Sequence, residues 1–118
     1  MTVVVDANLL VVLALDDERA PLVETKMHEW ATAGETLHAP ALMPYEAANA
    51  LVRATVAGDL APDVVADVWA TILAFPVTLH PLQRGAEVIA IAQRLGRQSA
   101  YDAAYVALAQ FLKSERGR

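Results

Sequence analysis

Three acidic side chains occupy positions in the sequence from which they could bind a metal ion or act in catalysis. Asp6 follows directly after the β-branched run 3–5, Glu46 comes two residues after Pro44, and Asp102 lies near the start of the last apolar segment. Asp6 is thus at the carboxyl end of an expected strand, which is where open parallel sheets place their ligands. If the other two acids open helices at that same edge, three carboxylates converge.

A cluster of carboxylates needs a cation. Two like charges about 4 Å apart repel by roughly 1 kcal/mol in water and about 4 kcal/mol at an effective dielectric constant of 20. A divalent metal relieves this repulsion, and oxygen ligands without cysteine or histidine favour a hard ion such as Mg²⁺ or Mn²⁺. Such an ion can activate water for attack on a phosphodiester, which is hydrolysis without a protein nucleophile.

Each acid also has a purely structural explanation. Asp6 can cap a helix that begins near Asn8, because aspartate and asparagine both serve as N-caps. Glu46 in the first turn of its helix is stabilised by the helix dipole, and Ser99 with Asp102 resembles a capping box. No single acid is therefore decisive, and it is their combination at one edge of a sheet that favours a site.

The elements that would position these acids alternate along the chain. Short β-branched or apolar runs predict strands at 2–5, 37–39 and 76–79, and segments bounded by proline and glycine predict helices at 8–15, 21–33, 44–57, 62–74, 83–95 and 99–112. Strands that alternate with helices imply right-handed crossovers and a parallel sheet. We expect an α/β fold with one domain over 1–112 and a polar C-terminal tail at 113–118.

Composition narrows the class of protein. The chain has 118 residues, 14 acidic against 9 basic side chains for a formal net charge of −5, 56% hydrophobic residues and no cysteine. The absence of cysteine excludes disulfides, zinc ribbons and a thiol nucleophile, and it fits a cytoplasmic protein. No signal peptide or membrane-spanning stretch is visible. The negative charge argues against bulk electrostatic binding of nucleic acid, but not against an enzyme that reaches nucleic acid through a metal.

The three acidic segments resemble the motifs of the PIN-domain family, in particular the VapC-type ribonuclease toxins of toxin–antitoxin pairs. The resemblance lies in residues 3–8, 39–51 and 99–109 and covers nearly the whole chain. It implies a PIN-like three-layer sandwich and an Mg²⁺- or Mn²⁺-dependent endoribonuclease that cleaves RNA with metal-activated water. By this resemblance Asp6, Glu46 and Asp102 are the catalytic metal ligands, and Asn8 and Ser99 support them. It also implies a homodimer and a small antitoxin partner.

The family continues into a further strand and a Thr/Ser-x-Asp motif that carries a fourth acid. Glu115, the only acid after Asp102, does not match that motif. Three alternatives follow: a three-carboxylate site completed by water, a partner chain or swapped segment that supplies the missing edge, or a degenerate member without activity. The last alternative gives a second functional hypothesis, a non-catalytic interaction module that binds an antitoxin or itself. A small-molecule-binding α/β domain has little support, because no phosphate or cofactor loop is visible.

Other polar and aromatic residues give weaker signals. The histidines have no ligand spacing and are interpreted as surface or partly buried side chains. The two tryptophans, Trp30 and Trp69, are interpreted as packing residues rather than stacking platforms for bases. Four arginines are weak candidates for phosphate contact, since isolated arginines on helices are usually solvated: Arg53, Arg84, Arg94 and Arg97.

Overall fold

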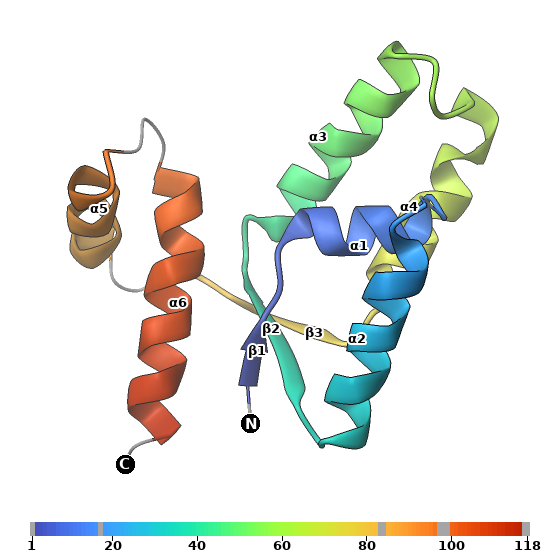
Figure 1. Cartoon of the computed structure of the whole chain (residues 1–118). Coiled ribbons are helices and arrows are strands. Elements are labelled where there is room, and N and C mark those ends of the chain that lie inside the picture. Colours follow the sequence, from blue (N-terminus) through green and yellow to red (C-terminus); the bar gives the residue numbers. More distant parts are fainter. Residues whose placement is uncertain (1, 17, 83–84, 97–99, 117–118) are drawn as a thin grey trace.

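The computed structural model describes residues 2–16, 18–82, 85–96 and 100–116 and confirms the α/β class (Figure 1). Three strands alternate with pairs of helices. The elements in chain order are β1 (Thr2–Val4), α1 (Ala7–Ala14), α2 (Ala20–Thr32), β2 (Thr36–Pro40), α3 (Met43–Val56), the 3-10 turn η1 (Pro62–Val64), α4 (Val65–Leu73), β3 (Val77–His80), α5 (Gly85–Arg94) and α6 (Ala100–Arg116).

The sheet is parallel, with strand order β1-β2-β3. Val3 pairs with Leu37, and Leu37 pairs in turn with Val77, so β2 is the middle strand. The ladder continues past β1, because the backbone N–H of Val5 donates to the carbonyl of His38 at 2.9 Å. All three strands therefore end at one edge of the sheet, and the chain leaves that edge into α1, α3 and α5.

Helices α1 to α4 gather on one side of the sheet (Figure 1). α1 packs against α2, α3 and α4, and its Leu10 is fully buried. Ala39 of β2 and Ala47 of α3 are equally inaccessible, since small side chains let these elements approach closely. The first core cluster consists of Ala7, Leu10, Val11, Ala39, Met43, Ala47, Leu51, Leu60 and Ile72.

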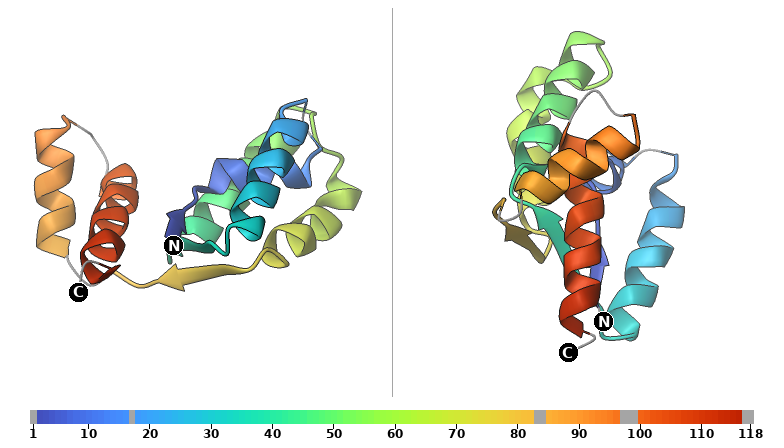
Figure 2. Two further views of the ribbon diagram at one scale, coloured as in Figure 1. Left: turned by 60° about the horizontal axis from the view of Figure 1, so that its bottom comes forward. Right: turned by 90° about the vertical axis from the view of Figure 1, so that its left-hand side faces the viewer.

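Helices α5 and α6 pack against each other around a second core cluster. Its members are Val88, Ile91, Ala92, Ala103 and Ala107. α6 also contacts β1 and β2, and Figure 2 shows the α5–α6 pair set apart from α1 to α4. The radius of gyration is 15.3 Å. A compact chain of this length has a radius of about 13.5 Å, so the two clusters form an extended molecule rather than one sphere.

Two elements differ from the sequence-based expectation. The helix expected over 62–74 begins with the 3-10 turn η1, and α4 proper starts at Val65. The last helix runs to Arg116 instead of ending near Leu112, because no proline or glycine interrupts the chain before Gly117. Four of the six residues expected as a tail, 113–116, are therefore helical. No helix in the described ranges is both long enough and apolar enough to cross a membrane.

Candidate functional site

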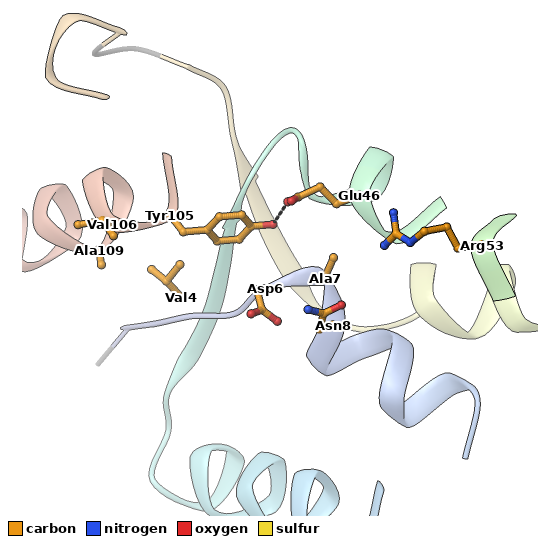
Figure 3. Close-up of a pocket in the computed structure, with 9 residues that line it drawn as sticks. All are labelled: Val4, Asp6, Ala7, Asn8, Glu46, Arg53, Tyr105, Val106 and Ala109. Atoms are coloured by element: carbon orange, nitrogen blue, oxygen red, sulfur yellow. Dashed lines mark hydrogen bonds between the residues drawn. The ribbon is translucent and has the colours of Figure 1, made fainter. Parts of the chain in front are cut away.

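A cleft of about 470 Å³ opens between the end of β1, the start of α1, the inner face of α3 and the middle of α6 (Figure 3). Asp6 and Glu46 both line it, as the convergence of strand ends at one edge predicts. The full lining is Val4, Asp6, Ala7, Asn8, Glu46, Arg53, Tyr105, Val106 and Ala109.

Asp6 caps α1. Its Oδ1 accepts a hydrogen bond of 3.1 Å from the backbone N–H of Leu9, and its own backbone is extended, as an N-cap requires. Asp6 is thus confirmed as a helix cap, but a capping aspartate can still bind a ligand in the cleft. An ionised carboxylate has two oxygens with several acceptor positions, and the cap uses one of them. The exposed Asp6 carboxylate retains Oδ2 for a second ligand.

Glu46 is half-buried and held by a helix on one side and a hydroxyl on the other. Pro44 begins α3 within its first two positions, which places Glu46 in the first turn. The Tyr105 hydroxyl donates a hydrogen bond of 2.5 Å to Glu46 Oε1 (Figure 3). One carboxylate oxygen is therefore fixed in position, and the rotamer of Glu46 is fixed with it.

Tyr105 links α6 to α3 across the cleft through its hydrogen bond to Glu46. Burial of its ring raises the pKa of its hydroxyl above the ordinary value of 10.0, and the hydrogen bond and negative charge of Glu46 raise it further. The charge of Asp6 adds to this shift, while a backbone hydrogen bond from Ala7 lowers the pKa. Tyr105 consequently remains a protonated donor at neutral pH. Tyr105 was not among the residues predicted to form the site, although its spacing of three from Asp102 on one helix face is a signal for such a role.

Asn8 and Arg53 complete the polar wall. Asn8, in the first turn of α1, lines the cleft together with Asp6 (Figure 3). Arg53 lies seven residues after Glu46 on α3 and is exposed, with its guanidinium directed back toward Glu46 (Figure 3). Of the four candidate arginines, Arg94 is exposed on α5 and does not line the cleft, and Arg84 and Arg97 lie outside the described residues.

The third acidic motif is described in part. Asp102 lies in the first turn of α6, and its side chain, like Ser99, lies outside what the structure describes. Among the described side chains no group of three histidines or acids is close enough to hold a metal ion, and Asp102 is not among them. The donors that are described fit a hard cation, because Asp6 and Glu46 offer carboxylate oxygens and Asn8 offers an amide oxygen to one cleft.

His38 and His80 are partly buried, as interpreted from the sequence, and their rings contact each other. His38 Nδ1 and His80 Nε2 are 2.8 Å apart, and Thr36 Oγ1 lies 2.8 Å from His38 Nε2. Burial lowers the pKa of His38, and the charge of His80 lowers it further. The two rings join β2 to β3 and are not among the residues that line the cleft. A separation of 42 residues gave no sign of this contact in the sequence.

Trp69 packs as interpreted from the sequence. Trp69 is half-buried against the first core cluster, and Lys26 Nζ lies 5.9 Å from the centre of the Trp30 ring.

Comparison with protein-family models and with curated proteins found no match to this chain.

Proposed function

We propose that this chain is a metal-dependent endoribonuclease of the VapC toxin type with a PIN-like fold. One observation carries the proposal: Asp6 and Glu46, from two segments 40 residues apart, line one cleft into which Tyr105 of the third motif also points. The segments that resemble the family's motifs thus meet at the carboxyl edge of the sheet, which is where parallel α/β folds place their ligands. The three parallel strands with helices on both sides are consistent with the PIN-like sandwich.

The residues of the cleft have separate tasks in this proposal. Asp6 and Glu46 are ligands for Mg²⁺ or Mn²⁺, with Asp102 of α6 as the third acid and Asn8 and Ser99 in support. The ion, when bound, supplies charge neutralisation at the phosphodiester and activates water. Tyr105 restricts Glu46 to one rotamer, which lowers the entropy lost when that carboxylate binds a ligand.

An exposed apolar stripe supports the partner side of the proposal. Tyr45, Val52 and Val56 follow one another at helical spacing along α3 and are 80%, 58% and 84% exposed. Apolar side chains gathered on one helix face are typical of contact surfaces between proteins. A homodimer or a small antitoxin is the partner that the family resemblance implies.

Calorimetric titration with Mn²⁺ tests the metal site. Asp6→Asn is the informative variant, because asparagine also caps helices and removes the carboxylate without removing the cap. Asp102→Asn tests the third ligand. Asp59→Asn is the matched control, since Asp59 is exposed and does not line the cleft.

We expect saturable Mn²⁺ binding and Mn²⁺-dependent cleavage of RNA by the wild-type protein and by Asp59→Asn. Both should be lost in Asp6→Asn and Asp102→Asn, while the circular dichroism spectra of all four proteins agree. Unchanged cleavage in either cleft variant would remove the assignment. Absence of Mn²⁺ binding in a folded wild-type protein would favour the second hypothesis, a non-catalytic module that binds an antitoxin or itself.

A further inference from the structure

Arg53 brings a positive charge into a cleft that otherwise carries negative ones. Of the nine described residues that line the cleft, Arg53 is the one cation, against the carboxylates of Asp6 and Glu46. Among the side chains that the structure describes, it forms no ion pair, whereas Lys26 and Glu29 do so at 3.5 Å. Arginine remains charged at any physiological pH and offers a planar set of donors suited to phosphate.

The position of Arg53 along α3 defines which phosphate it can reach. Seven residues of helix separate the Cα atoms of Arg53 and Glu46, which is two turns, or about 10 Å along the axis. The guanidinium of Arg53 is directed back toward Glu46 and spans part of this distance (Figure 3). A strand that runs along α3 from the carboxylates would bring its next phosphate to Arg53.

We propose that Arg53 binds a phosphate of single-stranded RNA that flanks the phosphate to be cut, and so lays the strand along α3. This inference rests on the proposed function, because it takes the reacting phosphate to be at Asp6 and Glu46. It goes beyond that function in defining the substrate as an oligonucleotide with at least one flanking phosphate. Because the formal net charge is −5, the protein as a whole repels RNA, and a cation in the cleft offsets this repulsion locally.

Two substrates distinguish contact with a flanking phosphate from a role of Arg53 in the reaction itself. Bis(p-nitrophenyl) phosphate has one phosphodiester and no flanking phosphate, whereas a single-stranded RNA oligonucleotide has many. The test compares kcat/KM for both substrates in Mn²⁺ between wild-type protein, Arg53→Gln and Arg94→Gln. Arg94 is the matched control, because it is an exposed helical arginine outside the cleft and its substitution changes the net charge equally.

We expect Arg53→Gln to lower kcat/KM for the RNA by about 10-fold or more, as loss of a charged hydrogen bond predicts. The loss on the small diester should be at least several-fold smaller. The dependence of log KM for RNA on log salt should flatten by about 0.7, the value for one phosphate contact on a single strand. Arg94→Gln should match the wild-type protein. Equal losses of Arg53→Gln on both substrates, or no loss on RNA, would overturn the inference.

Fluorescence anisotropy of a labelled RNA in Ca²⁺ tests the contact independently of catalysis. If the wild-type protein binds RNA in Ca²⁺ but does not cleave it in Mn²⁺, the proposed nuclease function fails while weaker binding by Arg53→Gln still supports the contact. Equal binding by the wild-type protein and Arg53→Gln refutes the contact. Absence of RNA binding by a folded wild-type protein overturns both proposals.

Discussion

The hydrogen bond from the Tyr105 hydroxyl to Glu46 makes a sharp prediction about stability. It joins α6 to α3 across 59 residues of sequence, and Tyr105 also packs against the first core cluster. Tyr105→Phe removes one oxygen atom and keeps the ring. The variant therefore isolates the hydrogen bond from the packing.

The expected loss follows from the environment of the bond. A hydrogen bond to a charged group contributes about 1.5–3 kcal/mol to the free energy of unfolding. Tyr105 and Glu46 are both half-buried, so water replaces part of the lost contact, and we expect about 1–2 kcal/mol. For a chain of this size that loss lowers Tm by about 4–8 °C.

Urea unfolding followed by circular dichroism measures this loss, with Tyr45→Phe as the control. Tyr45 lies on α3 near Glu46, but its side chain is exposed to solvent and does not line the cleft. We expect Tyr45→Phe to stay within about 0.5 kcal/mol of the wild-type protein. The reasoning would be refuted if Tyr105→Phe were as stable as the wild-type protein, or if both variants lost the same amount.

Three further predictions concern the fold. His38 has a lowered pKa, so its contribution to stability is complete above the unfolded-state value of 6.5 and is lost as the pH falls from there through the folded-state pKa. Urea midpoints between pH 8 and pH 5 should therefore fall less in His38→Gln than in the wild-type protein, and parallel curves would contradict this. Leu10→Ala should cost about 2–5 kcal/mol in urea unfolding, because Leu10 is fully buried, and a smaller cost would mean that the site collapses around alanine. Gly58→Ala should cost about 1–2 kcal/mol through backbone strain alone, since Gly58 has a φ of 81° and nothing lies within 4 Å of an added Cβ. Equal Tm values for Gly58→Ala and the wild-type protein would show that the backbone relaxes.

Local signals account for what the sequence predicted well. Pro21, Pro44 and Pro62 begin helical segments, and Gly34 and Gly58 follow the ends of two of them, so most boundaries fell within two residues of those observed. The capping role of Asp6 was predicted for the same reason. The C-terminal helix was expected to end too early because its polar residues were interpreted as a tail, although they form helix readily.

Contacts between distant segments account for what the sequence missed. That Asp6 and Glu46 share a cleft follows from the rule that parallel strands end at one edge, so this part of the site was predictable. The link between Tyr105 and Glu46 and the pairing of His38 with His80 depend on strand order and on the rotation of α6, and the sequence specifies neither by spacing. The sequence did not distinguish Arg53 from the three other candidate arginines, because its position in the cleft depends on the packing of α3.

The presence of two core clusters has a consequence for how the cleft moves. The second core cluster holds α5 and α6 together, and Tyr105 is the α6 residue that packs against the first core cluster. Detachment of the pair as one cooperative unit would therefore break the Tyr105 packing and the contacts of α6 with β1 and β2. The free energy that keeps the cleft closed is then the docking energy of α6, a fraction of the global stability. Asp6 and Glu46 would stay on their folded elements while α6, with Tyr105, moves away from them. A protein that grips the outer surface of α5 or α6 could therefore regulate the cleft from a distance, by shifting this opening equilibrium rather than by blocking the carboxylates.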